Sequence, residues 1–256
     1  MIEKIHGPPA HLSTHPHVPM RKFLQRLRGQ LHRLRYDRYW RTRPAQWSYG
    51  INIIDQALST GSYRTVLDAG CGRGDVVAHL LRKGYEARGV EVSQFAVQNG
   101  EVVTGEVLQG DLASLPFPDR HFDLVFSSEV LEHIPADQIP KVARELVRVC
   151  GRRLFLTISL RPSSQNNAFH CTLRSRNWWE QRFIEAGAQP VSDLVARFQQ
   201  RGPFDNREVI LRGPASGLIG EIEGFLTHPP YSFGGELEPW YFIFEPAGSA
   251  LPPNSH

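Results

Sequence analysis

The sequence predicts an α/β protein built on a doubly wound, mostly parallel sheet of seven strands. Short apolar runs alternate with helix-like segments through the middle of the 256-residue chain, and this alternation is typical of a parallel sheet with helices on both faces. One of these runs, residues 64–69, leads into a glycine-spaced turn and then an apolar helix. That order is typical of the strand–turn–helix unit with which such sheets bind nucleotide-like ligands.

Each element of this sheet can be placed along the chain from its pattern of apolar residues. Strands are expected at residues 64–69, 85–91, 105–109, 122–127, 153–160, 189–195 and 240–245. Helices are expected between them at residues 74–83, 93–99, 136–149 and 177–187. The stretch 197–238 is long, contains glycine and proline and has weak periodicity, so we interpret it as an insertion that recognises the substrate.

Two further helices are expected before the first strand. Residues 1–18 are rich in proline, histidine and glycine, and we expect them to be mobile. Residues 20–41 have the spacing of an amphipathic helix that ends before Pro44. The apolar residues of this helix are Leu24, Leu27, Leu31 and Leu34. Residues 48–60 have the pattern of a second helix.

The N-terminal segment, residues 1–45, is strongly basic. It carries ten lysines and arginines against Glu3 and Asp37, a balance of +8 in a chain whose net charge is +3. Nine of the ten lie within residues 21–43, and such a block favours an anionic partner such as a membrane surface, a phosphorylated glycolipid or nucleic acid. Two interpretations stay open: a lid helix over a cofactor pocket with solvated arginines, or a foot on an anionic membrane surface.

The composition is that of an ordinary globular protein, with 41% hydrophobic and 21% charged residues. No apolar run approaches the roughly 20 residues that span a bilayer, and we expect no cleavable signal peptide in residues 1–20. The three cysteines, Cys71, Cys150 and Cys171, are widely spaced, which argues against a disulfide framework and a cysteine zinc site. We therefore expect a cytoplasmic protein, peripheral on the inner membrane face if residues 21–43 form a foot, and assign no metal ligands.

The glycine-rich turn and the acids around it carry the most specific signal. The turn reads Asp68-Ala69-Gly70-Cys71-Gly72-Arg73-Gly74, so an acid lies two residues before the first of three glycines in G-x-G-x-G spacing. A dinucleotide site would show G-x-G-x-x-G instead. A second acid, Glu91, ends the next apolar run, where a ribose-binding carboxylate should fall. This segment resembles the first motif of class I S-adenosylmethionine (SAM)-dependent methyltransferases.

A second block of sequence resembles the same family. It contains Gly110-Asp111, Leu115-Pro116-Phe117, Phe122-Asp123-Leu124-Val125 and Leu131-Glu132-His133-Ile134. This block is similar to the G-D-x-x-x-L-P-F, F-D-L-V and L-E-H-I pattern of the small-molecule branch of these methyltransferases. The resemblance covers residues 64–160, with a looser tail to residue 187. It implies a Rossmann-like methyltransferase domain over residues 46–248, between the basic extension 1–45 and a tail at 249–256.

The resemblance implies SAM as the cofactor and indicates which residues would bind it. Asp68 and the glycines would line the methionine moiety, and Glu91 would accept hydrogen bonds from both ribose hydroxyls. Asp111 and the amide of Leu112 would contact the adenine. The full set of expected cofactor contacts is Asp68, Gly70, Cys71, Gly72, Glu91, Val92, Asp111, Leu112 and Ser127. Arg73 is expected to be a turn residue that faces solvent.

Two histidines are candidates for the base that an alcohol acceptor needs. His133 belongs to a block shared by relatives with unlike acceptors, so a structural or cofactor-side role is open for it as well. His170 lies in the loop after the fifth strand, where an acceptor would enter, and a histidine suits proton transfer near neutral pH. We therefore take His170 as the first candidate. The helix that follows carries Trp178 and Trp179, of which we expect one in the core and the other freer.

We expect a SAM-dependent O-methyltransferase whose acceptor is a hydroxyl on a glycan, a lipid-linked saccharide or another small molecule. A polyprenyl quinone-type methyltransferase is the second hypothesis, because a histidine followed by a tryptophan-bearing helix resembles enzymes of that group as well. A nucleic-acid methyltransferase is not favoured, since the Pro229-Pro230-Tyr231 run lies far from the end of the fourth strand, where amino-methylating DNA enzymes carry such a motif. A SAM-binding regulator without catalysis also stays open.

Overall fold

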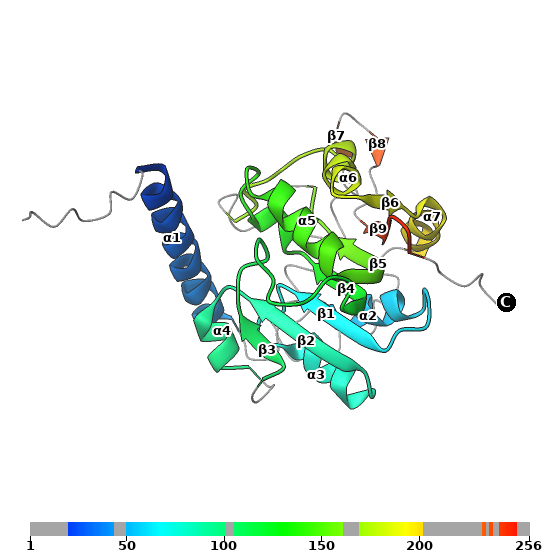
Figure 1. Cartoon of the computed structure of the whole chain (residues 1–256), viewed down its shortest axis with the longest axis horizontal. Helices are drawn as coiled ribbons and strands as arrows, with labels where there is room; N and C mark the ends of the chain where they lie inside the picture. Colours follow the sequence, from blue (N-terminus) through cyan, green and yellow to red (C-terminus); the bar gives the residue numbers. More distant parts are fainter. Residues whose placement is uncertain are drawn as a thin grey trace, which may run out of the picture.

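A seven-stranded sheet forms the centre of the computed structural model (Figure 1), with the strand order β3-β2-β1-β4-β5-β9-β6. The structure describes residues 20–43, 50–100, 105–160, 169–201, 232–233, 236–237 and 241–249. The strands of the sheet are β1 (Thr65–Ala69), β2 (Glu86–Glu91), β3 (Val107–Gln109), β4 (Phe122–Ser128), β5 (Cys150–Thr157), β6 (Ala188–Pro190) and β9 (Tyr241–Pro246). The predicted α/β class with a seven-stranded sheet is confirmed.

The directions of the strands show where a ligand can bind. β1 to β5 run parallel, while β9 is antiparallel to both β5 and β6. The chain moves outward from β1 to β3 and then returns to place β4 on the other side of β1, so the order reverses between β1 and β4. Open α/β sheets bind ligands at the carboxyl ends of the strands beside such a reversal.

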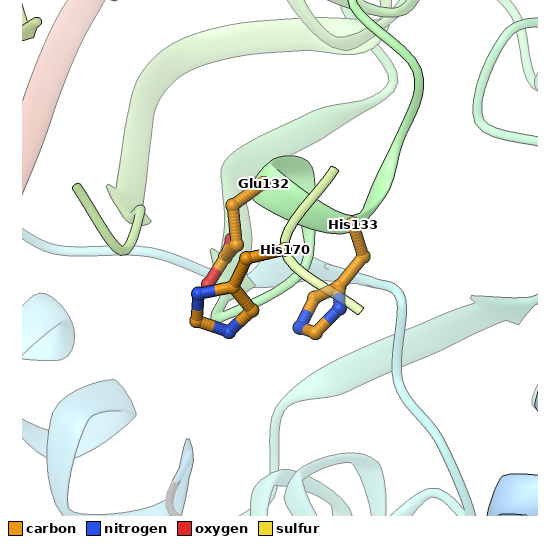
Figure 2. A group of neighbouring side chains, drawn as sticks. All are labelled: Glu132, His133 and His170. Carbon is orange, nitrogen blue, oxygen red and sulfur yellow. The ribbon is translucent and has the colours of Figure 1, made fainter. Parts of the chain in front are cut away.

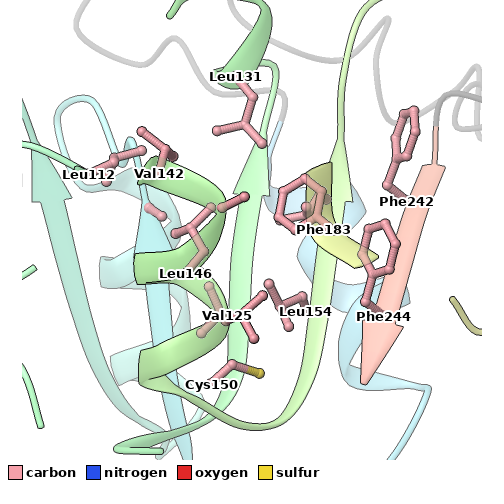
Figure 3. Close-up of a cluster of buried hydrophobic side chains, with 14 of the residues drawn as sticks. Leu112, Val125, Leu131, Val142, Leu146, Cys150, Leu154, Phe183, Phe242 and Phe244 are labelled. Carbon is pink, nitrogen blue, oxygen red and sulfur yellow. The ribbon is translucent and has the colours of Figure 1, made fainter. Parts of the chain in front are cut away.

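Helices cover both faces of the sheet, because alternate residues of a strand point to opposite sides. On one face, α5 (Ile139–Val149) and α6 (Arg176–Glu185) share a buried cluster with Val125, Leu154 and Phe244 (Figure 3). On the other face, α2 (Gly50–Leu58) and α3 (Asp75–Arg82) share a second cluster with the neighbouring residues Leu124 and Phe155. Adjacent residues of β4 and β5 thus enter different cores, as expected of strands buried on both faces.

The structure corrects the strand predicted at residues 189–195. Only β6 is extended there, and the chain turns after Pro190 into the helix α7 (Ser192–Arg201). The helix forms because Val191, Leu194, Val195 and Phe198 recur at helical spacing and pack against the second cluster. The ring of Phe198 lies edge-on to that of Phe155, with 5.3 Å between their centroids.

The helix predicted over residues 20–41 is confirmed as α1 (Met20–Thr42), which lies beside α4 (Gln94–Gln98) rather than on the sheet (Figure 1). Its residues Leu31 and Leu34 are 59% and 64% exposed. Among the described residues, no helix combines the length and the apolar character that crossing a membrane would require.

Most of the predicted insertion at 197–238 lies outside the described residues. Within it the structure describes the end of α7 and a two-stranded antiparallel pair, β7 (Ser232–Phe233) and β8 (Glu236–Leu237). The predicted mobile segment at 1–18, the Pro-Pro-Tyr run and the tail after Ser249 lie outside the described residues as well.

Candidate functional site

The glycine-rich loop lies at the carboxyl end of β1 and has a backbone that side chains would obstruct. Gly70, Gly72 and Gly74 adopt φ values of 85°, 55° and 82°, in the left-handed region that favours glycine. A Cβ atom on Gly70 would lie 2.5 Å from the side chain of Val130, and one on Gly72 would lie 2.5 Å from the ring of Trp40. Val130 and Trp40 therefore pack against the backbone of this loop, residues 70–74, which we call the glycine cradle.

Glu91, the predicted ribose acceptor, ends β2 directly beside this loop. Its Oε2 atom accepts a hydrogen bond from the Gly72 amide at 3.0 Å, and its Oε1 atom accepts one from the Ser93 amide at 2.8 Å. Burial raises the pKa of its carboxyl group, against the lowering effect of these backbone hydrogen bonds. Each carboxylate oxygen has two lone pairs, so both can still accept a ligand hydroxyl.

Three buried acids surround the loop, which favours a positively charged ligand. Asp68, Asp75 and Glu91 are 4%, 7% and 6% exposed. Burial, followed by the negative charges of Glu91 and Asp75, raises the pKa of Asp68 to about 8. A cation beside these carboxyl groups would offset the cost of their burial. SAM carries an ammonium and a sulfonium group, so the glycine cradle and the acids fit this cofactor.

The remaining predicted cofactor contacts lie around the same edge in different environments. The thiol of Cys71 is buried, which raises its pKa well above the ordinary value. Asp111 is exposed and accepts a hydrogen bond from the Ala113 amide at 2.9 Å.

Ser127 is fully buried and donates to the Ala69 carbonyl at 2.7 Å, so its hydroxyl joins β4 to β1. Half-buried Val92 follows β2, and buried Leu112 follows Asp111. Their contacts with the cofactor stay predictions.

The α1 helix closes over this cofactor edge. Its Asp37 carboxylate accepts hydrogen bonds from the Ser93 hydroxyl at 2.6 Å and from the Phe95 amide at 3.0 Å. Arg73 donates from its guanidinium to the carbonyls of Trp40 and Arg43 at 2.8 and 3.3 Å. Our expectation that Arg73 faces solvent was wrong: it is 9% exposed, because α1 covers it.

Sequence reasoning missed Asp37 and Trp40 as residues of this edge. One signal was available, because Asp37 is the single acid within the basic segment 21–43. Its partners Ser93 and Phe95 lie far away in sequence, so the partners themselves were not predictable.

A second group of polar side chains lies after β4, where the chain forms a short 3-10 helix, η1 (Leu131–His133). Glu129 opens this turn with a φ of 55°, a strained value for a residue other than glycine. Glu132 is fully buried, and its Oε1 accepts a hydrogen bond from the Ser159 amide at 3.2 Å. Its pKa lies well above the ordinary value because of burial and the neighbouring charge of Glu129.

The structure brings the two candidate histidines together (Figure 2). The rings of His133 and His170 lie edge to face with 4.8 Å between centroids, although the residues are far apart in sequence. The loop that carries His170 is held against η1, since the Thr172 amide donates to the Glu132 carbonyl at 2.9 Å and the Thr172 hydroxyl donates to the Ile134 carbonyl at 2.6 Å. The two histidines thus occupy one site at the carboxyl edge.

The α1 helix reaches this second group as well. The ring of Tyr36 lies 6.1 Å from that of His133 and 6.3 Å from that of Phe169. Burial raises the pKa of the Tyr36 hydroxyl well above its ordinary value, and the Arg35 guanidinium lies 4.3 Å from the centre of the Phe169 ring. Sequence reasoning missed Tyr36, which has no motif around it.

Of the two adjacent tryptophans in α6, one lies in the core and the other is less buried, as predicted. Trp179 is fully buried in the core cluster, and Trp178 is half-buried beside it. Their rings are perpendicular, with centroids 5.0 Å apart. Trp178 therefore has an accessible portion on the helix that follows the His170 loop.

Residues 67–153 match the family model described as a methyltransferase domain. The chain is 29% identical over 139 residues to an ajmaline N-methyltransferase of Rauvolfia serpentina, across 45% of this chain and 47% of the relative. It is 31% identical over 125 residues to a ubiquinone biosynthesis O-methyltransferase of Alkalilimnicola ehrlichii, across 44% of this chain and 49% of the relative. The chain therefore spans about half the length of the curated relatives it matches.

A solved structure described as "Conversion of a Disulfide Bond into a Thioacetal Group during Echinomycin Biosynthesis" matches 62% of this chain and 80% of that chain. Its TM-score is 0.51 and its sequence identity is 22%, so this likeness shows the fold alone. The fold, the glycine cradle with its acids and the matched domain together support a SAM-dependent methyltransferase domain in this chain, with SAM as its cofactor.

Proposed function

We propose that this chain methylates a hydroxyl group on a glycan, a lipid-linked saccharide or another small molecule, with SAM as the methyl donor. The observation that carries the proposal is the placement of His133 and His170 in one site after β4 and β5. That site adjoins the cofactor cradle, because Val130, just before η1, touches the space above Gly70. Bound SAM supplies an activated methyl group, and the chain has to hold the acceptor in line and manage its proton.

The surroundings of His170 suit it to take the proton from the acceptor. In Figure 2 the Glu132 carboxyl group points toward a ring nitrogen of His170, and a carboxyl group in this position orients a histidine ring. His133 is held differently, since its Nδ1 lies 3.0 Å from the Phe169 carbonyl. We assign proton removal to His170 and positioning of the loop to His133.

The test is a methyl-transfer assay that measures demethylated SAM with candidate acceptors added one class at a time. On an accepted substrate, His170→Ala should lower turnover by about 10²- to 10⁴-fold, the contribution typical of a general base, with SAM affinity near that of the unchanged protein. His121→Ala is the matched control, because His121 is exposed and stacks on Phe117 at the start of β4. Near-normal turnover by His170→Ala would contradict the assignment of proton removal to His170. If no acceptor class turns over, the SAM-binding regulator becomes the better hypothesis.

A polyprenyl quinone-type acceptor is the second candidate. One observation favours it: the matched relatives include a ubiquinone biosynthesis O-methyltransferase, although over about half its length. Hydroxylated quinone precursors therefore form a separate arm of the assay. Turnover in that arm, with none on glycans or lipid-linked saccharides, would select this candidate over the first.

We propose that α1 has two functional parts. Its C-terminal part, with Asp37 and Trp40, acts as a lid on the cofactor edge, as the contacts with Ser93 and Gly72 support. The basic segment 21–43 also serves as a foot on an anionic membrane surface, for which the exposed leucines of α1 provide apolar contacts. On this proposal the protein works in the cytoplasm at the inner membrane face, and nucleic acid is not its partner.

A further inference from the structure

Three side chains after β4 and β5 have the residue types of a divalent-cation site. Glu132, His133 and His170 each offer one ligand atom, and these atoms all lie within 4.8 Å of one another. Two histidines and one carboxylate are a ligand set that suits transition metals such as Zn²⁺, Fe²⁺, Co²⁺ and Mn²⁺. With metal–ligand bonds of about 2.1 Å, the ligand atoms of such a site lie roughly 3–3.5 Å apart. Ligand atoms up to 4.8 Å apart would reach this spacing through small rotations of the two half-buried imidazoles.

A second observation points independently to a ligand at this place. The Glu132 side chain is fully buried, and its carboxyl group lies against that of Glu129. Two buried carboxyl groups in contact repel each other when ionised, and a cation beside them would offset that cost. Glu132 points toward the His170 ring (Figure 2), and a cation between Glu132, His133 and His170 would contact its carboxyl group.

The orientation of His133 also suits a metal ligand. A carbonyl oxygen can only accept, so the nitrogen that contacts the Phe169 carbonyl, Nδ1, carries the hydrogen and donates it. The lone pair of that ring is then on Nε2. Histidines that bind metals have this arrangement, with one nitrogen on the metal and the other donating to a backbone carbonyl or a carboxylate.

We propose that Glu132, His133 and His170 bind one divalent transition-metal cation, which holds the hydroxyl oxygen of the acceptor. The role of the cation rests on the proposed methyl transfer, whereas the site itself does not. A bound cation would occupy the ring nitrogens, so in the loaded protein His170 is a ligand and the cation lowers the pKa of the acceptor hydroxyl. In the metal-free protein His170 takes the proton itself, whereas in the loaded protein the hydroxyl proton leaves to water because the cation has lowered its pKa.

The experiment titrates Zn²⁺ and Co²⁺ into the full chain after removal of metal with a chelator. The four histidines at positions 6, 11, 15 and 17 could bind metal themselves, so every protein tested carries alanine at these positions. Calorimetry should show one Zn²⁺ per chain, and Co²⁺ should give the visible absorption of a site with nitrogen and oxygen ligands. His170→Ala and Glu132→Gln should each weaken Zn²⁺ binding at least tenfold, while His121→Ala should leave it unchanged.

The outcomes separate the site from the function. Zn²⁺ affinity that is equal in His170→Ala and the parent protein would overturn the proposal, as would the absence of binding in the parent. Turnover by the metal-free protein, with no binding, would leave methyl transfer standing with His170 as a free base. Binding at the site without turnover on any acceptor would support the site and reject the proposed function. Because Glu132 is buried and its variant could misfold, SAM affinity is measured in each variant as a check, and His170→Ala decides the result.

Discussion

At the scale of single residues, the carboxyl group of Asp68 has the environment with the clearest chemical consequence. Burial and the charges of Glu91 and Asp75 raise its pKa to about 8, whereas an aspartate in the unfolded chain has a pKa of about 3.9. Between these values the folded protein binds a proton that the unfolded chain has released. This group therefore makes the free energy of unfolding fall as the pH rises from about 4 to about 8.

The same shift predicts that SAM binding releases a proton. The positive groups of SAM favour the ionised form of Asp68, so below about pH 8 the carboxyl group should lose its proton on binding. SAM affinity should then increase as the pH rises from about 6 to about 8. Calorimetry in buffers of different ionisation enthalpy measures the proton directly. In Asp68→Asn the proton release should disappear, and an unchanged release in that variant would contradict the assignment.

At the scale of elements, the contact between α1 and α4 joins the basic extension to the cofactor edge. Asp37 accepts hydrogen bonds from both the N-cap residue and the first turn of α4, namely Ser93 and Phe95. The aromatic residues of α1 extend the same contact to Phe169 in the acceptor-side loop. One helix therefore touches both the cofactor edge and the site that contains His133 and His170. Its position should respond to a ligand at either place.

Loss of the Asp37 contact should loosen this lid. A hydrogen bond to a charged group contributes about 1.5–3 kcal/mol when buried, and less here because Asp37 is half-buried. We expect Asp37→Ala to weaken SAM binding by roughly 3- to 10-fold and to speed tryptic cleavage within residues 21–43. Asp119→Ala is the control, since Asp119 is exposed and pairs with Arg148 on the surface. Unchanged cleavage and affinity in Asp37→Ala would show that α1 is not a lid.

At the scale of the whole molecule, charge is distributed unevenly. Residues 1–45 carry +8, which leaves −5 on the rest of the chain from a total of +3. A strongly basic segment attached to an acidic body should orient the protein on a negatively charged surface. The exposed Leu31 and Leu34 lie within this basic segment.

This asymmetry predicts binding to anionic but not to neutral lipid vesicles. Binding should weaken as salt rises through about 0.15 M, because charge attraction is then screened over about 8 Å. Replacement of Leu31 and Leu34 by serine should reduce vesicle binding and leave SAM affinity unchanged, since both side chains are exposed. Sedimentation with vesicles measures the effect. Equal sedimentation with anionic and neutral vesicles would leave α1 as a lid alone.

Much of the fold was predictable because its signals are local. The strands β1 and β4 contain short apolar runs, and the loop between β1 and α3 needs glycine where φ is positive. The edge strand β6 and the helix α7 were not separated correctly. The apolar residues there fit both an extended and a helical pattern over a short window, and the packing against Phe155 and Tyr241 selects the helix.

The sequence by itself determined the order of the sheet elements, the glycine cradle and the acids Asp68 and Glu91, since each depends on neighbours in the chain. Only the tertiary structure decided that Arg73 is buried, that Asp37 binds the start of α4, and that His133 and His170 meet beside Glu132. These arrangements join segments that are distant along the chain. The residues at each end carry no local pattern that names their partner, because the contact exists only once the sheet has brought the ends of its strands to one edge.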